Sequence, residues 1–191
     1  MDGASVGPYS EAMTPDAARG APGGAVPAFT LDLPAPGDAD ALAELHHRVW
    51  RHAYAGILPE HALGDTALAS RRSTWHRMLA QWSHDQLSGR IRIGRAPDGA
   101  PAGFLTVGPS RDEGAPRPFE LQALNVDPAF HGTGLAQALV RDLLQDRPAY
   151  LWVVEENPRA RRFYEKVGFR ADGGVKVDPD LGDLREIRMT R

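Results

Sequence analysis

The chain has 191 residues, of which 42% are hydrophobic, and a formal net charge of -3 at pH 7. This length suits one domain with a tail, and the mildly acidic balance gives no broad basic surface, so nucleic acid is not an expected partner. The absence of cysteine excludes disulfides, thiolate nucleophiles and cysteine metal sites. With no apolar run near the roughly 20 residues that span a bilayer and no secretory signal, we expect a soluble, cytoplasmic protein without a membrane partner.

The N-terminal segment 1–27 is rich in Gly, Ala, Pro and Ser and shows no hydrophobic periodicity. Such a composition buries too little apolar surface to offset the entropy of ordering, so we expect a disordered tail, or alternatively a conditional interaction arm. A single folded domain is expected over 28–191.

The domain begins with a predicted strand at 29–33, where apolar and polar residues alternate. Two helical regions follow, at 36–56 and 60–82, because apolar residues recur there at helical spacing. In the second region Trp75 and Trp82 are seven residues apart and indicate a stripe that faces the core.

The hydrophobic period then changes to that of strands. A hairpin is predicted over 90–108 with Asp98-Gly99 as its turn, and another strand over 119–126. A helix at 135–146, a strand at 149–156, a short helix at 158–168 and a closing hairpin over 169–191 complete the pattern. This order predicts a mixed α/β sheet covered by helices.

The turn after the strand at 119–126 brings Gly132 and Gly134 to the start of a helix. Unpaired N–H groups at a helix N-terminus bind anions, and glycine lets a phosphate approach the backbone closely. A tight turn that needs glycine at positive φ is the alternative, and the stretch alone does not separate the two.

Three classes of phosphate site compete for this turn. A P-loop requires Gly-Lys-Ser/Thr, which the sequence lacks. A dinucleotide fingerprint requires a third small residue where Gln137 stands. Glu155, about 20 residues downstream of the glycines, nevertheless keeps a nucleotide-binding oxidoreductase as an alternative.

The third class fits better, because two motifs match it. His131-Gly132-Thr133-Gly134-Leu135-Ala136, preceded by Val126-Asp127-Pro128, resembles the acyl-CoA pyrophosphate signature of the GNAT N-acetyltransferases, a Gcn5-related family. His131 stands where Gln or Arg is usual, which leaves the role of that side chain open. Residues 157–169 resemble the second family motif through Asn157, Ala160, Phe163, Tyr164, Lys166, Gly168 and Phe169. Together the motifs and their strands cover roughly 119–170.

The resemblance implies an α/β (α+β) fold with a mixed, mostly antiparallel central sheet of six to seven strands and about four flanking helices. It implies acetyl-CoA as co-substrate, held where the strands near Asn125 and Asn157 splay apart. The residues that the resemblance assigns to cofactor binding are Leu124, Asn125, Val126, His131, Gly132, Thr133, Gly134, Leu135, Ala136, Asn157, Ala160, Phe163 and Tyr164. Arg159, Arg161, Arg162 and Lys166 either reach the adenosine phosphates or form a solvated helix face.

Transfer of an acetyl group to an amine requires removal of a proton from the ammonium, stabilisation of the carbonyl oxygen and protonation of the leaving thiolate. The resemblance points to Tyr164 as the general acid, to backbone N–H near Val126 for the oxygen, and to Glu120 as the base. Strand alternation places Glu120, Gln122, Leu124 and Val126 on one face. A salt bridge or an edge position is the alternative for Glu120, and a water relay can replace it as the base.

The acceptor is expected to be a primary amine of a small molecule or peptide. By resemblance, Trp50, Tyr54, Ile57 and Leu58 are candidates for its binding wall, with hydrophobic packing as the alternative. The histidines show no metal-ligand spacing, so we expect no metal. A homodimer is common in the family. A catalytically silent acyl-CoA-binding or regulatory domain is the main alternative function.

Overall fold

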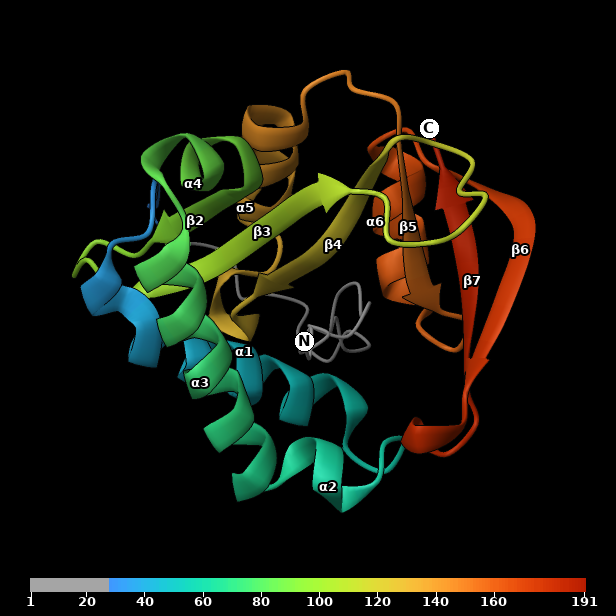
Figure 1. The fold of residues 1–191 in the computed structure, drawn as a ribbon, viewed down its shortest axis with the longest axis horizontal. Coiled ribbons are helices and arrows are strands. Elements are labelled where there is room, and N and C mark those ends of the chain that lie inside the picture. The colour runs from blue at the N-terminus through green and yellow to red at the C-terminus, as the bar shows by residue number, and fades with distance from the viewer. Residues whose placement is uncertain (1–27) are drawn as a thin grey trace, which may run out of the picture.

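The structure, a computed structural model, describes residues 28–191, so the tail predicted for 1–27 lies outside the described residues. Seven strands form one sheet in the order β1-β2-β3-β4-β5-β7-β6 (Figure 1). All neighbouring strands are antiparallel except β4 and β5, which confirms the expected sheet. The strands are β1 Thr30–Asp32, β2 Ile91–Arg95, β3 Pro101–Pro109, β4 Phe119–Val126, β5 Ala149–Val154, β6 Arg170–Asp178 and β7 Leu184–Thr190.

Six α-helices occur in residues 28–191, where about four were expected. Gly64 has an extended backbone and divides the second helical region in two. The helix α4 lies in a stretch for which no element was expected; Ser83 and Gln86 form a reciprocal capping box at its start. The helices are α1 Ala39–Tyr54, α2 Glu60–Leu63, α3 Asp65–Gln81, α4 His84–Arg90, α5 Leu135–Leu139, which continues into the π-helical turn η3 Val140–Leu144, and α6 Pro158–Lys166.

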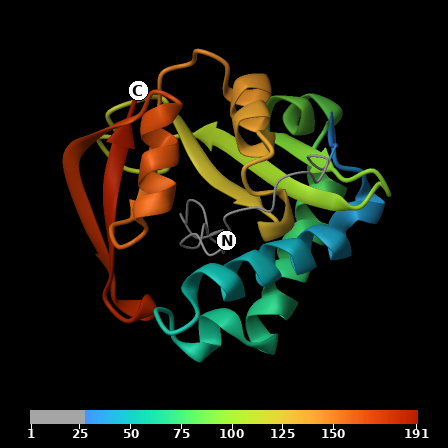
Figure 2. The ribbon, with the colours of Figure 1, turned by 180° about the vertical axis from the view of Figure 1, so that it is seen from behind.

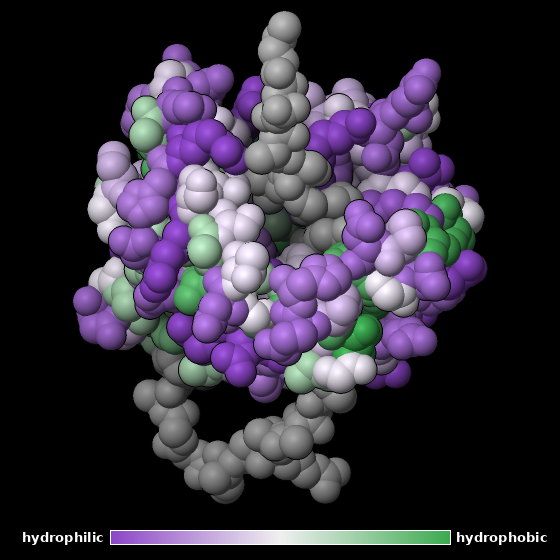
Figure 3. All heavy atoms as spheres, turned by 60° about the horizontal axis from the view of Figure 1, so that its bottom comes forward, coloured by the Kyte–Doolittle hydropathy of each residue, from purple (hydrophilic) through white to green (hydrophobic). Residues whose placement is uncertain are grey.

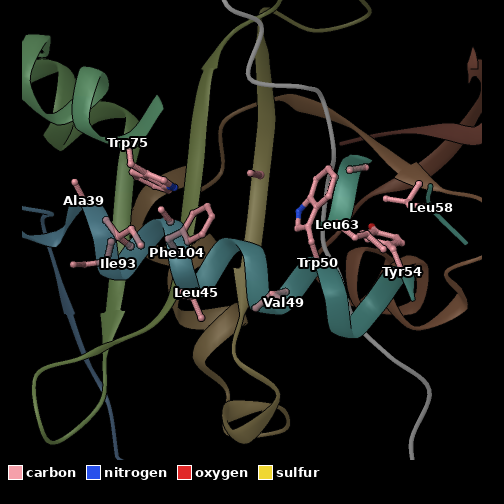
Figure 4. Packing of buried hydrophobic residues seen from close by; sticks show 14 of the residues in the cluster. Ala39, Leu45, Val49, Trp50, Tyr54, Leu58, Leu63, Trp75, Ile93 and Phe104 are labelled. Carbon is pink, nitrogen blue, oxygen red and sulfur yellow. The ribbon is translucent and has the colours of Figure 1, made fainter. Parts of the chain in front are cut away.

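Two hydrophobic clusters lie on opposite faces of the sheet. On one face, α1 and α3 pack over β2 and β3, with Leu45, Trp75 and Phe104 among the buried residues (Figure 4). On the other face, α5 and α6 pack on the central strands through residues such as Leu139 and Tyr164. Figure 2 shows these two helices in front of the sheet. The central strands β3 and β4 are therefore covered on both faces, whereas the edge strand β6 is largely exposed.

The strand β4 contains a bulge that changes which of its residues share a face. Thr106 pairs with Ala123 and Val107 pairs with Leu121, so Gln122 is an extra residue. Leu121 consequently packs in the same cluster as Leu124, whereas Ala123 belongs to the opposite cluster. The prediction that Glu120, Gln122, Leu124 and Val126 share one face is therefore wrong, because regular alternation does not continue through a bulge.

The two parallel strands β4 and β5 stay paired only at their first residues, through Phe119 with Ala149 and Glu120 with Tyr150. Beyond this point β4 continues its pairing with β3 up to Val126, and β5 continues its pairing with β7 up to Val154. Their facing edges therefore diverge, as Figure 1 shows. This confirms the predicted separation and leaves backbone groups of β4 available for another partner.

The surface over α1–α3 is mostly hydrophilic, with hydrophobic side chains in separate small patches (Figure 3). Ile57, Val175 and Val177 are the exposed large hydrophobic residues of the described chain. None of the helices within 28–191 is long and apolar enough to cross a membrane.

Candidate functional site

The turn between β4 and α5 is held by its own side chains. Asp127 accepts a hydrogen bond from the Ala129 N–H and caps a 3-10 turn, Pro128–Phe130. The Thr133 hydroxyl donates to the Phe130 carbonyl over 2.8 Å and accepts from the Leu135 N–H. These bonds fix the path that brings the glycines to the start of α5.

Both glycines of this turn have left-handed backbone conformations, with φ of 76° at Gly132 and 90° at Gly134. An added Cβ at either position would have no described atom within 4 Å. The conformation thus requires glycine, as the tight-turn alternative proposed, while the space in front of both residues is open. An open surface of glycine backbone next to a helix start is compatible with an approaching anion.

The imidazole of His131 faces inward to the end of β4. Its Nε2 lies 3.1 Å from the Val126 carbonyl oxygen, which an Nε2–H donor satisfies. Burial, together with the positive charge of Arg159, lowers the pKa of His131 to about 4, so the ring is neutral at pH 7. The His131 side chain therefore fixes the turn and carries no charge toward an anion.

In the first turn of α6, the positive charge of Arg159 acts on His131 and helps to lower the pKa of its imidazole. Asn157 caps the helix by accepting from the Ala160 N–H over 3.0 Å, and Gly168 ends it with φ of 99°. Local sequence signals predicted both ends. The cap gives Asn157 a structural role in the short connection between the end of β5 and the start of α6.

Tyr164, the tyrosine predicted as general acid, belongs to α6 and is fully buried between this helix and the sheet. Its ring makes edge contacts with Phe163 and Phe169, with centroid separations of 5.4 and 5.8 Å. Ala160 is also fully buried, and Phe163 is partly buried in the same cluster. The motif residues Ala160, Phe163 and Tyr164 thus form the sheet-facing side of α6, whereas Lys166 is exposed.

The glutamate predicted as general base, Glu120, is 1% exposed and lies at the start of β4. Arg111, from the loop between β3 and β4, binds both carboxylate oxygens, with Nη2 to Oε1 at 2.6 Å and Nε to Oε2 at 2.9 Å. The Tyr150 hydroxyl donates to Oε2 over 3.2 Å. The salt-bridge alternative for Glu120 is therefore present in the structure.

A buried amide without a partner lies where the two strands diverge. Asn125 is 0% exposed, and neither its Nδ2 nor its Oδ1 has a hydrogen-bond partner among the described residues. Buried amides are costly when unsatisfied, so this side chain favours a polar ligand or water at the divergence.

Two cavities flank the C-terminal half of α1. The larger cavity, about 390 Å³, lies between α1, α3 and the β3–β4 surface, and Trp50 lines it. The smaller cavity, about 240 Å³, is lined by Tyr54 and Ile57 together with Asn157 and Arg159. Trp50 and Tyr54 contact each other at 5.6 Å between ring centroids. Three of the four residues expected at the acceptor wall therefore divide between two cavities, and the fourth, Leu58, is buried and lines neither.

Neither predicted catalytic residue, Glu120 or Tyr164, lines either cavity. Trp75 and Trp82, predicted as a core stripe, both line the larger cavity. Arg71 also lines it and was not singled out from the sequence, since one arginine on a helix with many polar residues carries no distinguishing pattern. Within 28–191 no group of three potential metal ligands comes together.

Comparison with known proteins gives a consistent result. Residues 49–169 match the model of the acetyltransferase (GNAT) family. An uncharacterized N-acetyltransferase of Mycobacterium bovis is 32% identical over 170 residues, which cover 78% of this chain and 98% of that protein.

Two solved structures illustrate the similarity of the fold. The PaiA N-acetyltransferase of Thermoplasma acidophilum, in complex with coenzyme A, superposes with a TM-score of 0.62 at 20% identity, covering 84% of this chain and 98% of that chain. YncA of Salmonella typhimurium, with its cofactor acetyl-CoA, gives 0.61 at 17% identity, covering 86% and 93%. At these identities the likeness concerns the fold alone.

Proposed function

Because the chain belongs to the GNAT acetyltransferase family, we propose that it is an acetyl-CoA-dependent N-acetyltransferase that acts on a primary amine by direct attack. The observation that carries the proposal is the divergence of β4 and β5 beyond Glu120, with the glycine turn and the start of α6 on either side. An extended molecule that ends in phosphates fits such an opening.

The residues at the opening have the chemistry that coenzyme A needs. Backbone and side-chain groups of Leu124, Asn125 and Val126 would pair with amides of the pantetheine, and the unsatisfied amide of Asn125 supports this. The pyrophosphate would lie on the turn from His131 to Ala136, where Gly132 and Gly134 leave open space. Asn157, Ala160 and Phe163 would contact the same molecule from α6. Bound acetyl-CoA supplies an activated thioester.

Backbone geometry supports the Val126 N–H as the donor for the oxygen of the reacting carbonyl. The Asp127 N–H donates to the Ala102 carbonyl on β3. Because successive N–H groups of a strand point to opposite sides, the Val126 N–H points to the open side that faces β5. A backbone N–H fixed in this way stabilises negative charge as it develops.

The transfer itself breaks one C–S bond and forms one C–N bond. The ammonium gives a proton to the base, the neutral amine attacks the carbonyl carbon, and the thiolate leaves with a proton from Tyr164. Glu120 remains our candidate base. Because Arg111 and Tyr150 already occupy its oxygens, proton transfer through water is favoured over direct contact with the amine.

One observation favours a catalytically silent acyl-CoA-binding or regulatory domain as the second candidate function. Glu120 and Tyr164 are both buried and line neither cavity. A domain that binds the cofactor without turning it over would tolerate this placement. Oligomeric state and cytoplasmic location remain predictions from the sequence.

Titration calorimetry with acetyl-CoA and with NAD(H), followed by a screen of amines for release of free coenzyme A thiol, tests the proposal. We expect binding of acetyl-CoA alone and thiol release with at least one amine. Binding of acetyl-CoA without turnover of any amine would establish the silent domain, and binding of NAD(H) alone would refute the whole assignment.

A further inference from the structure

The larger cavity has walls of a distinctive chemistry. Trp50, Trp75, Trp82 and Phe104 contribute aromatic surface, and Trp75 contacts Phe104 edge-on with 4.9 Å between ring centroids. Figure 4 shows Trp50 and Trp75 on either side of Phe104. A volume of about 390 Å³ accommodates a molecule of amino-acid size.

A single charged residue, Arg71, stands among the described residues that line this cavity. Its guanidinium lies 4.6 Å from the centroid of the Trp50 ring, and it donates to the Ala62 carbonyl over 3.1 Å. Burial lowers the pKa of Arg71 to about 10, so the side chain remains protonated at pH 7. The group is thus a fixed cation at the wall of a cavity that aromatic and other apolar side chains line together with uncharged polar ones such as Thr74 and Gln122.

The charge of Arg71 has no acidic partner in the described part of the chain. Its remaining close neighbour is the Nδ1 of His47, 3.2 Å from Nη1. Burial and the charge of Arg71 lower the pKa values of His46 and His47, so both rings are neutral at pH 7 and neither compensates the cation nor adds to it. A half-buried cation without a counter-charge favours an anion from outside the chain.

The cavity is also next to the proposed reaction centre. Gln122 and Ala123 of β4 form part of its wall, and they lie in the part of β4 that is no longer paired with β5. An acceptor in the cavity can therefore direct its amine to the open edge of β4 while another part of it contacts Arg71.

Resting on the proposed function, we propose that the acceptor is an amino-acid-sized primary amine that carries a carboxylate and an aromatic or large apolar group. Arg71 binds the carboxylate, and the tryptophans with Phe104 surround the apolar group. Because no Asp or Glu among residues 28–191 lines the cavity, polyamines and other polycations have no counter-charge there and meet the positive charge of Arg71.

Matched amines with and without a carboxylate test the proposal by binding alone. L-phenylalanine is compared with 2-phenylethylamine, and L-tryptophan with tryptamine, by titration calorimetry in the absence and presence of coenzyme A. We expect the amino acid to bind at least tenfold more tightly in at least one pair. Equal affinities in both pairs, tighter binding of the decarboxylated amines, or no measurable binding of any of the four would overturn it.

Variants of the neighbouring arginines locate the effect. Arg71→Met is expected to remove the preference for the carboxylate, and Arg71→Lys to retain part of it. Arg72→Met is the matched control, since Arg72 is on the same helix, is exposed and pairs with Glu44. A preference that survives in folded Arg71→Met, or that is lost equally in Arg72→Met, would refute the role of Arg71. Affinity for acetyl-CoA, measured separately, reports whether the proposed function itself fails.

Discussion

Arg111 binds both carboxylate oxygens of Glu120 inside the sheet, although the two residues belong to a loop and a strand nine positions apart. The ion pair compensates a carboxylate that is almost completely buried, and it fixes the β3–β4 loop over the start of β5. Any role of Glu120 in proton transfer thus coexists with a structural role, and variants must separate the two.

Glu120→Gln is expected to lower both stability and turnover. The substitution leaves Arg111 without its counter-charge. Removing one partner of a fully buried ion pair lowers the free energy of unfolding by about 3–5 kcal/mol. Because Arg111 is partly exposed, we expect a loss of about 2 kcal/mol here. If Glu120 is the base, the variant also loses the limb of the pH–rate profile that rises toward alkaline pH. Arg111→Met is the control, because it removes the same ion pair and keeps the carboxylate. Identical pH–rate profiles for wild type and Glu120→Gln would remove Glu120 as the base.

Gly134→Val is expected to abolish binding of acetyl-CoA. The side chain would occupy the open space in front of the turn, and its left-handed backbone costs about 1–2 kcal/mol in stability. Gly99→Val is a matched control: Gly99 also has a positive φ, 86°, with no described atom near an added Cβ, and lies in the turn before β3. We expect the two variants to lose equal stability. Calorimetry should show that the affinity for acetyl-CoA is lost only in Gly134→Val. Unchanged affinity in both variants would refute the phosphate site.

Signals confined to a few neighbouring residues predicted much of the fold. The Asp98-Gly99 turn, the Asn157 cap and the Gly168 stop all lie where the sequence placed them. Gly99 and Gly168 depend on their own positive φ, and the Asn157 cap depends on a hydrogen bond to the residue three positions on. The separation of β4 and β5 followed from the family resemblance. The helix at 84–90 was missed, although Ser83 with Gln86 is a capping-box pattern, since seven residues give too little periodicity.

Features that depend on distant partners could not be predicted. The bulge at Gln122 arises from pairing with β3, and the two consecutive apolar residues Ala123 and Leu124 break the alternation of the strand without locating the bulge. The partner of Glu120 comes from a loop whose path no local signal defines. Periodicity places Trp75 on the inner face of α3 but cannot distinguish a packed core from the wall of a cavity.

Tyr164→Phe is expected to reduce kcat by on the order of 10²-fold, with little change in the affinity for acetyl-CoA. The substitution keeps the ring that packs between Phe163 and Phe169, so the hydrophobic cluster is retained. Steady-state kinetics with an accepted amine and calorimetry with acetyl-CoA give the two readouts. A kcat equal to that of the wild type would show that the hydroxyl does not protonate the thiolate.

Glu186 gives the folded protein a pH dependence that Glu186→Gln is expected to remove. The side chain is 0% exposed on β7, with the Lys176 Nζ 3.1 Å from Oε2, and Asp178 and Glu120 are the acidic groups that act on it. Burial raises the pKa of Glu186 from 4.5 to about 7. Because the folded state holds the proton more tightly than the unfolded state, this contribution to stability is complete below pH 4.5 and is lost as the pH rises through 7. The free energy of unfolding from urea titrations should therefore fall by up to about 3 kcal/mol between pH 5 and 9 in the wild type, relative to Glu186→Gln.

Glu155→Gln, at a partly exposed carboxylate paired with Arg185, serves as the control and should follow the wild-type curve. Parallel curves for the wild type and Glu186→Gln would mean that Glu186 is already ionised at pH 5 and that the Lys176 pair outweighs its burial.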